Sequence, residues 1–302
     1  MGDFLKYMEL FTDFLLVERG YSKHTVEAYE RDVNQFFDYC NSITGRSLTP
    51  EEVGKRRLRD YLGVLSEIGL EDSSISRKLA AIKSFYKFLL THGYISKNPA
   101  GRIRSPKKSK KLPVVLSETE ITRLLDSLEA SGFIESRNKA IMELLYSTGM
   151  RLGELVGVKY GDIDLRRQLV KVFGKGAKER IVPVGKKATE SVSNYLKYRI
   201  AKFGFPGYEE PLFVSSRGRQ LSRRMVQLIV KKYLEMVSEK GKLSPHVLRH
   251  TFATHLLDNG ADINSVKELL GHKNLATTQI YTHVSVGHLK EVYRQAHPHA
   301  EE

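Results

Sequence analysis

The residues best suited to chemistry lie in one stretch, residues 244–283. Ser244 is a good N-cap residue and Pro245 suits the first helical position, so a helix is predicted to begin there with His246 in its first turn. Free backbone N–H groups and the positive end of the helix dipole favour an anion at such a helix start. At about 100° per residue, Arg249 falls in the middle of an apolar arc, where a guanidinium needs an anionic partner. A single arginine of this kind could also extend along the helix end to reach water. The arc comprises Leu248, Phe252, Ala253, Leu256 and Leu257.

Two further polar residues follow in the same stretch. A second predicted helix, INSVKELL, ends at Gly271, a typical C′ residue, and His272 comes directly after it. Tyr281 lies nine residues further on. Tyrosine, with a pKa of about 10, is a poor nucleophile at neutral pH unless cationic groups stabilise the transition state. A tyrosine beside clustered Arg and His side chains fits attack on a phosphodiester. Taken alone, Tyr281 could equally be a buried or capping tyrosine, because the chain has 15 of them.

Three polar residues upstream could join this set. Arg151 and Glu154 follow Gly149, which ends a predicted helix, and at a spacing of three residues they face the same way on a short helix. Alone, they would form only an intrahelical ion pair. Lys175 lies between two glycines at the tip of a predicted β-hairpin made of residues 169–173 and 180–184. A lysine there could protonate a leaving oxygen, or could simply be exposed. The GKGAK turn lacks the spacing of a phosphate-binding nucleotide loop, so no nucleotide site is predicted.

Together these motifs carry a resemblance to a known family. HVLRHTFATHLL and LLGHKNLATTQIYTH resemble the C-terminal signature of tyrosine site-specific recombinases, most closely the Xer type of bacteria. STGMRLGELVGVKYGDIDL and VFGKGAKERIVPVG extend the resemblance upstream, and with a helical N-terminal third it covers nearly the whole chain. Met150 stands where many relatives carry leucine, which is a near-isosteric change.

The resemblance implies a mainly α fold of the DNA breaking-rejoining type. An N-terminal four-helix, SAM-like core-binding domain would precede a mixed but mostly helical catalytic domain with a small β-hairpin. Tyr281 would attack DNA and form a 3′-phosphotyrosyl bond, with His246 as general base and Lys175 as general acid. The remaining site residues implied by the resemblance are the phosphate-binding Arg151, Arg249 and His272, with Glu154 in a supporting role. No metal and no cofactor are implied.

Composition agrees with a nucleic-acid partner. The chain has 302 residues and a net charge of +14, of which +6 lies in residues 1–111 and +8 in the remainder, so both parts are basic. Such a distribution favours a long polyanion over one anionic pocket. The single cysteine, Cys40, excludes an intrachain disulfide and a cysteine-based zinc site. No apolar run reaches the about 18 residues of a membrane span, and no signal peptide is recognised, so a cytoplasmic location is expected.

The predicted domains are residues 1–98, a basic linker at 99–116, and 117–302. In the first, four helices are expected, with the third opened by residues 49–52 and the fourth beginning near Ser73 or Ser74. By resemblance, two helices of this domain would lie against the DNA major groove. Basic residues expected on exposed positions of the fourth helix, either in contact with DNA or simply solvated, are Arg77, Lys78, Lys83 and Lys87.

The linker and the C-terminus complete the organisation. Residues 99–116 contain three prolines and six Lys or Arg without an Asp or Glu, as expected for a strap across the phosphate backbone or for a basic spacer. After Tyr281, VGHLKEVYRQAHPHAEE is predicted to form a last helix that docks into a neighbouring subunit, as the resemblance implies, or packs in cis. His297 and His299 are expected in a solvated tail and not as metal ligands.

The leading prediction is a recombinase that resolves chromosome or plasmid dimers at cell division through a Holliday junction. Its partners would be double-stranded DNA carrying a specific site, three further subunits in a homo- or hetero-tetramer with a sister recombinase, and a division-linked DNA translocase. Alternatives are a phage or mobile-element integrase, a type IB topoisomerase and a non-catalytic DNA-binding protein. The sequence leaves open the recombination site and the need for a second recombinase.

Overall fold

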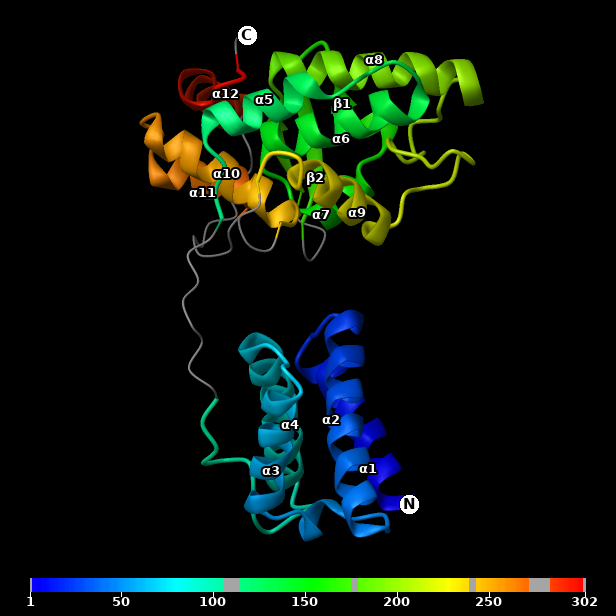
Figure 1. The fold of residues 1–302 in the computed structure, drawn as a ribbon, viewed down its shortest axis with the longest axis vertical. Coiled ribbons are helices and arrows are strands. Elements are labelled where there is room, and N and C mark those ends of the chain that lie inside the picture. Colours follow the sequence, from blue (N-terminus) through cyan, green and yellow to red (C-terminus); the bar gives the residue numbers. More distant parts are fainter. Residues whose placement is uncertain (1, 106–113, 175–178, 239–242, 272–282, 301–302) are drawn as a thin grey trace. The chain divides into compact units, whose positions relative to one another are not determined.

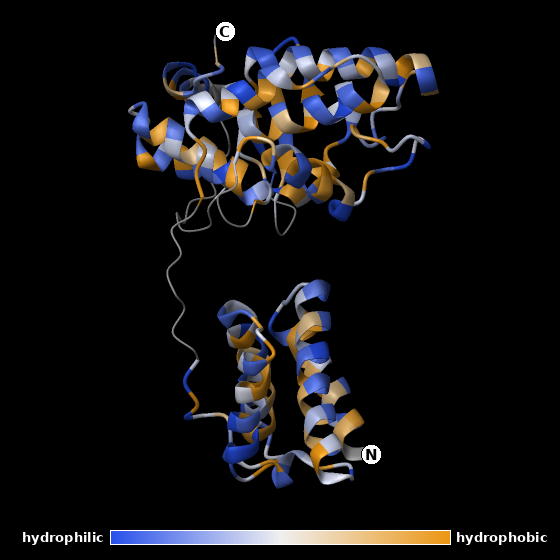
Figure 2. Ribbon diagram, viewed as in Figure 1, coloured by the Kyte–Doolittle hydropathy of each residue, from blue (hydrophilic) through white to orange (hydrophobic). Residues whose placement is uncertain are grey.

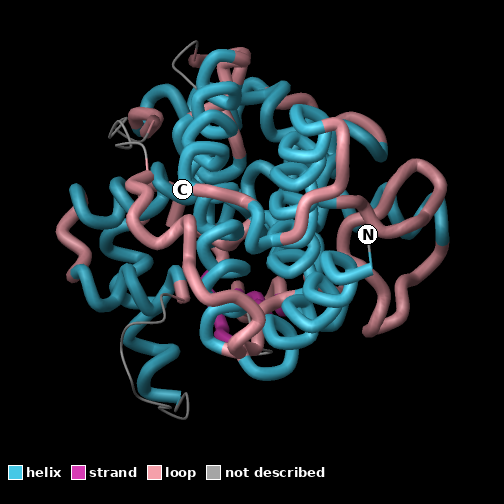
Figure 3. The backbone as a smooth tube through the Cα atoms, turned by 90° about the horizontal axis from the view of Figure 1, so that it is seen from below, coloured by secondary structure: helices cyan, strands magenta, loops and turns pink. Residues whose placement is uncertain are grey.

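The computed structural model describes residues 2–105, 114–174, 179–238, 243–271 and 283–300, with side chains at all of these except 2, 3 and 283–286. Two compact units divide the chain, Met1–Lys111 and Leu112–Glu302, and each has its own hydrophobic core. Both are built mainly of helices, and the three strands form a small part of the second unit (Figures 1 and 3). Apolar and polar positions alternate around the helices of both units, as expected where one face of each helix is buried (Figure 2).

The N-terminal unit contains the four expected α-helices. Residues 49–52, predicted to open the third helix, form a capping box of Thr49 and Glu52 that starts only one 3-10 turn, because Val53 and Gly54 adopt extended backbone conformations. The third helix therefore begins at Lys55 and not at Thr49. The elements of the N-terminal unit are α1 (Gly2–Asp13), the π-helical η1 (Phe14–Glu18), α2 (Lys23–Thr44), the 3-10 turn η2 (Pro50–Glu52), α3 (Lys55–Glu67) and α4 (Asp72–Thr91).

The expected exposure of Lys78 is wrong. Lys78 is only 8% exposed and donates to Asp32 of α2 at 3.1 Å, and Arg77 also forms an ion pair with this carboxylate. Asp32 is fully buried, so it needs cationic partners to remain charged. Lys78 follows Ile75 by three residues, which places it on the apolar face of α4. The ion pairs of Asp32 with Arg77 and Lys78 therefore connect α4 to α2 inside the unit.

The C-terminal unit is arranged around α6, which is buried at Ser136, at Arg137 and from Ala140 to Thr148, and which packs against α8, α9 and α10. Its elements are α5 (Glu118–Ser127), α6 (Phe133–Thr148), α7 (Leu152–Gly157), the 3-10 turn η3 (Tyr160–Asp162), β1 (Ile163–Asp164), β2 (Leu169–Phe173), β3 (Glu179–Pro183), α8 (Lys186–Phe203), α9 (Arg223–Leu234), α10 (Pro245–Asp258), α11 (Ile263–Leu270) and α12 (His283–Ala296). A capping box of Ser117 and Glu120 starts α5, with Ser117 N donating to Glu120 Oε2 at 2.8 Å.

The predicted hairpin is part of a three-stranded antiparallel sheet in the order β1-β2-β3. Val170 pairs with Val182, and Val172 pairs with Arg180, so these positions share one face. All four are buried. The face that packs on the core of the unit thus carries one arginine among valines.

The C-terminal segment packs in cis, and the expected solvated tail is wrong. Tyr293 of α12 donates to or accepts from Ser147 of α6 at 2.7 Å, and both His297 and His299 are buried. His299 contacts Thr122 at 3.0 Å and lies 3.9 Å from the Glu143 carboxylate. Burial lowers the pKa of His297 to about 3. These residues sit over α6 because the rings of Tyr146 and Tyr293 provide apolar surface for the imidazoles.

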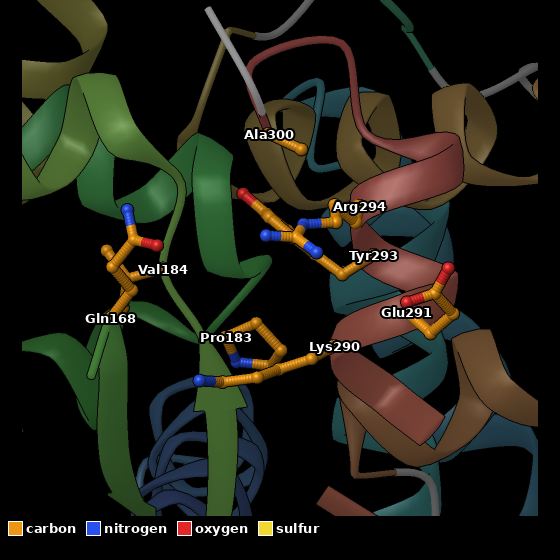
Figure 4. A pocket seen from close by; sticks show the side chains of 8 residues that line it. All are labelled: Gln168, Pro183, Val184, Lys290, Glu291, Tyr293, Arg294 and Ala300. Carbon is orange, nitrogen blue, oxygen red and sulfur yellow. The ribbon is translucent and has the colours of Figure 1, made fainter. Parts of the chain in front are cut away.

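A pocket of about 140 Å³ lies where α12 meets the end of β3. Lys290 and Arg294 extend from α12 toward Pro183 and Val184 (Figure 4). Glu291 also lines this pocket, so its walls carry charges of both signs. The pocket therefore lies at the interface where α12 packs on β3, the strand that carries Arg180.

Gly149 connects α6 to the segment that carries Arg151. Its backbone is left-handed, with φ at +58°, and its carbonyl accepts a hydrogen bond from Arg249. A Cβ atom added there would lie 2.3 Å from Cδ1 of Phe252 on α10. Only glycine meets both requirements without strain.

We expect Gly149→Ala to lower the free energy of unfolding of the C-terminal unit by at least about 2 kcal/mol, since strain at a left-handed residue adds to the overlap with Phe252. Urea unfolding of the full chain measures this loss. Gly157→Ala is the matched control, because an added Cβ there meets nothing within 4 Å. Equal midpoints for the two variants would contradict this account of Gly149.

Candidate active site

Helix α10 carries two of the predicted site residues. Ser244 is the N-cap residue and Pro245 the first helical residue, as predicted, although the Ser244 side chain makes no capping hydrogen bond within the described part of the chain. His246 is exposed in the first turn, while Arg249, one turn further on, is 8% exposed. The predicted apolar arc is correct at Leu248, Phe252 and Leu256 but not at Leu257, which is exposed.

The guanidinium of Arg249 joins two segments that are far apart in the sequence. Its Nη1 donates to the carbonyl of Gly149 and its Nη2 to the carbonyl of Leu270, both at 2.6 Å. Burial, together with the charge of Arg151, lowers the pKa of Arg249 to about 10, and Glu154 opposes this shift only in part. The buried cation therefore faces an unfavourable environment that a nearby anion would relieve.

Arg151 and Glu154 form a second part of the site at the start of α7. Arg151 Nη1 donates to Glu154 Oε1 at 2.8 Å, and the backbone N–H of Arg151 donates to Glu154 Oε2 at 2.8 Å. A longer contact of 3.5 Å joins Arg151 Nη2 to the carbonyl of Gly271. The Arg151 side chain is 43% exposed and the Glu154 side chain only 6%, so the arginine can reach a ligand while its carboxylate partner stays covered.

Arg180 is a residue of this cluster that the sequence analysis did not single out. Its Nη1 and Nη2 donate to the two oxygens of Glu154 at 3.1 and 2.8 Å, and its Nε donates to the carbonyl of Leu269 at 3.0 Å. The signal was present in the strand pattern. Position 180 alternates with Val182 and so faces the core, where an arginine requires a partner.

The hydrogen bonds and ion pairs of these residues determine the electrostatics of the cluster. The guanidinium groups of Arg151 and Arg180 bind one carboxylate, which also acts electrostatically on Arg249, so the three cations leave two positive charges in excess. Burial alone would raise the pKa of Glu154, but hydrogen bonds and charge from Arg180, with further bonds from Arg151, lower it below its usual value. The cluster is thus a partly covered cationic site that suits a phosphodiester.

Three predicted site residues, Lys175, His272 and Tyr281, lie outside the described residues. Their chain neighbours belong to the elements above. Lys175 follows β2 and precedes β3, which carries Arg180. His272 directly follows Gly271, whose left-handed backbone at φ +65° ends α11 as predicted. The structure therefore brings together Arg151, Glu154 and Arg249, with His246 on the same helix as Arg249.

The N-terminal unit has basic surfaces of its own. Arg77 and Lys87 are exposed and Lys83 is half-buried, whereas Lys78 is covered. Arg59, Arg102 and Arg104 line a hollow of about 520 Å³ between α3 and the start of the linker, with Leu62 and Ile103 among its apolar walls. No acidic side chain lines this hollow among the described residues.

Among the described residues, no group of three or more His, Cys, Asp or Glu side chains lies close enough together to bind a metal ion. No helix in the described part of the chain has the length and apolar character needed to cross a membrane.

Comparison with known families decides the relationship. The model of the phage integrase family matches residues 114–288, and that of the phage integrase N-terminal SAM-like domain matches residues 8–93. The chain belongs to the phage integrase family of tyrosine recombinases. It is therefore a DNA strand-exchange enzyme, with the mainly helical fold that the sequence predicted.

Relatives in this family match along nearly the entire chain. Tyrosine recombinase XerC of Pelobacter propionicus is 43% identical over 300 residues, covering 99% of this chain and 98% of its own. Tyrosine recombinase XerD of Halalkalibacterium halodurans is 41% identical over 297 residues, covering 97% and 98%. A crystal structure of a lambda integrase tetramer bound to a Holliday junction has a TM-score of 0.70, with 18% identity and coverage of 91% of this chain and 75% of that one. At that identity it shows a shared fold alone.

We expect the contribution of Glu154 to stability to depend on pH. Its pKa is lower in the folded than in the unfolded chain, so this contribution is present above about pH 4.5 and is lost as pH falls through the folded pKa. Glu154→Gln leaves the buried Arg180 without its anion and should cost about 3 kcal/mol or more at pH 7. Urea unfolding of both proteins between pH 7 and pH 3 measures the difference.

Glu209→Gln is the control, because its carboxylate pairs with Lys159 but is 85% exposed. At pH 7, Glu209→Gln should lower the free energy of unfolding much less than Glu154→Gln does. A difference between wild type and Glu154→Gln that stays constant from pH 7 to pH 3 would argue against an ionised Glu154 in the folded protein.

Proposed function

We propose that the chain is a site-specific recombinase that cuts and rejoins double-stranded DNA with Tyr281 as its nucleophile, and that its substrates are chromosome or plasmid dimers. One observation supports this best: Arg151 and Arg249 are fixed on the same pair of backbone segments, around one covered carboxylate, with His246 exposed on the helix of Arg249. This arrangement supplies two planar cations for the oxygens of one phosphate.

The proposed reaction is a transesterification. The Tyr281 oxygen attacks phosphorus, a new P–O bond forms to tyrosine, and the bond from phosphorus to the 5′ oxygen breaks. His246 takes the tyrosine proton, and Lys175 gives a proton to the departing 5′ oxygen. Arg151, Arg249 and His272 stabilise the charge that grows on the non-bridging oxygens. Because one ester replaces another of similar energy, no nucleotide hydrolysis is needed.

Strand exchange follows from reversal of this step. A 5′ hydroxyl from a second duplex attacks the phosphotyrosyl bond, so that two duplexes become joined as a Holliday junction. We propose that four subunits on two sites carry this out, supported by the fold shared with the lambda integrase tetramer. Relatives named XerC and XerD are similar to this chain to nearly the same extent, so a partnership with a sister recombinase is part of the proposal.

DNA would be bound by both units. The Arg59, Arg102 and Arg104 hollow stands at the root of a linker in which further Lys residues follow without a carboxylate, which suits a strap on phosphates. Exposed Arg77 and Lys87 on α4, with Lys83, are the proposed contacts of the first unit. The protein would act in the cytoplasm, where bacterial chromosomes lie, with a division-linked DNA translocase as its activating partner.

The alternative functions differ in what the protein would do to DNA. A mobile-element integrase would join non-identical sites, a type IB topoisomerase would relax supercoils without a second site, and a non-catalytic binding protein would form no covalent bond. The near full-length similarity to XerC and XerD proteins favours the recombinase of chromosome dimers.

We expect wild-type protein to form a denaturant-resistant covalent adduct with a suicide substrate, and Tyr281→Phe to form none. The substrate is a duplex selected from chromosomal fragments by binding to the protein and then nicked near the cleavage site, so that the short 5′ product is lost and religation fails. The adduct is measured by denaturing gel electrophoresis, and binding by the Tyr281→Phe variant, expected unchanged, is measured by gel shift.

Wild-type adduct formation in EDTA should equal that in magnesium, because the proposed chemistry uses no metal. Adducts that persist in Tyr281→Phe would identify another nucleophile. Tight, specific binding by wild type with no adduct at any selected site would instead support the non-catalytic alternative.

We expect Lys87→Ala to weaken DNA binding to a similar extent on all sequences and to reduce the slope of log K against log salt by about one, as loss of a phosphate contact requires. Fluorescence anisotropy between 50 and 300 mM salt measures both quantities. Lys78→Met is the contrasting variant, because Lys78 is covered and pairs with Asp32. It should lower the thermal midpoint of the N-terminal unit and leave the slope unchanged, and the opposite pattern would mean that the assignment of these two lysines is reversed.

A further inference from the structure

Arg180 connects three elements of the arginine cluster. It is 5% exposed, and its guanidinium spans from β3 to α7 and to the end of α11. Three of its N–H groups point to defined acceptors at 2.8 to 3.1 Å, two on Glu154 and one on the carbonyl of Leu269. A guanidinium bound in this way has little freedom to rotate.

Through Glu154, Arg180 determines the position of Arg151. Each oxygen of the Glu154 carboxylate accepts one bond from Arg180 and one from Arg151, so the carboxylate has a defined orientation between two cations. Were Arg180 removed, the side chain of Glu154 could rotate and Arg151 could follow it. A displacement of about 1 Å in a group that contacts the reacting atoms can cost 100-fold in rate.

The same guanidinium also supports the end of α11. It donates to Leu269, and it packs beneath Gly271, where an added Cβ would lie 3.1 Å from Arg180 Nη1. The carbonyl between these two residues, that of Leu270, accepts from Arg249. One side chain therefore contacts the supports of both Arg151 and Arg249.

Charge gives Arg180 a second effect on Arg151. A covered carboxylate that paired with Arg151 alone would neutralise it and reduce its attraction for a phosphate. With Arg180 on the other side, the charge of Glu154 is already offset, and Arg151 retains its positive charge for a ligand. Geometry and charge thus lead to the same role.

We propose that Arg180 is a positioning residue for DNA cleavage, which acts through Glu154 and the Leu269–Leu270 carbonyls on Arg151 and Arg249 without touching DNA. This inference rests on the proposed function. A purely structural arginine would lower stability when replaced but would leave the cleavage rate of the folded protein unchanged, and this difference separates the two roles.

The test measures the single-turnover rate of covalent adduct formation on the nicked substrate, with the full chain and with saturating protein, corrected for the folded fraction. We expect Arg180→Gln to slow adduct formation at least about 100-fold while DNA affinity changes little. The double variant Arg180→Gln with Glu154→Gln should then be faster than Arg180→Gln alone, by at least about tenfold, because it no longer places an uncompensated carboxylate on Arg151.

Arg199→Gln is the matched control. Arg199 is equally buried and also binds one carboxylate, of Glu210 at 2.9 Å, and one carbonyl, of Leu212 at 3.4 Å, but it is on α8. Its rate per folded molecule should stay within about twofold of wild type. Should Arg180→Gln fail to fold, Arg180→Lys and the double variant serve instead, since the first keeps a second cation beside Glu154 and the other removes the charge of Glu154.

Each outcome decides the proposal. A rate for Arg180→Gln equal to that of Arg199→Gln would overturn it, and so would a double variant slower than the single one, or Arg180→Lys at the full wild-type rate. Absence of adducts with the wild-type protein would overturn the proposed function itself, which is a separate result. Slow cleavage by Arg180→Gln with partial recovery in the double variant, or slow cleavage by Arg180→Lys, supports the positioning role.

Discussion

A covered carboxylate shared by two arginines is the interaction on which the site depends. Three guanidinium groups brought together repel one another, and burial makes this repulsion stronger. Glu154 offsets part of it, and the backbone carbonyls of Gly149, Leu269 and Leu270 accept one further N–H group each. The negative charge of Glu154 does not fully offset the positive charges of the arginines, as the lowered pKa of Arg249 indicates. A site that is short of negative charge when empty will favour a transition state in which a phosphate gains negative charge.

The fold supplies this cluster from segments distant in sequence. Gly149 ends α6 in a left-handed conformation against Phe252, which turns the chain so that Arg151 becomes the N-cap residue of α7. The β3 strand brings Arg180 in from the sheet, and the left-handed Gly271 ends α11 above it. The C-terminal helix packs on the same unit, with Tyr293 on Ser147 and two buried histidines over α6. Each of these supports is a backbone group or a buried side chain, as the precise placement of site residues requires.

Much of this could be predicted from local sequence. The helix starts at Ser117 and Ser244, the left-handed ends at Gly149 and Gly271, and the hairpin all follow from capping and turn rules. Local patterns failed where a distant partner decides the outcome. Lys78 is buried because Asp32 lies opposite, and His297 and His299 are buried because aromatic rings of α6 and α12 cover them. Arg180 was missed because its meaning depends on Glu154, 26 residues away.

The binding of one phosphate by both Arg151 and Arg249 decides whether this site can cleave DNA as proposed. It is tested most directly by the structure of Tyr281→Phe bound to an uncleaved duplex that carries its site. We expect guanidinium nitrogens of both Arg151 and Arg249 within about 3 Å of non-bridging oxygens of the same phosphate, with Glu154 still bound to Arg180 and neither Glu154 nor Arg180 touching DNA. Arginines on different phosphates, or a scissile phosphate bound elsewhere on the protein, would contradict it.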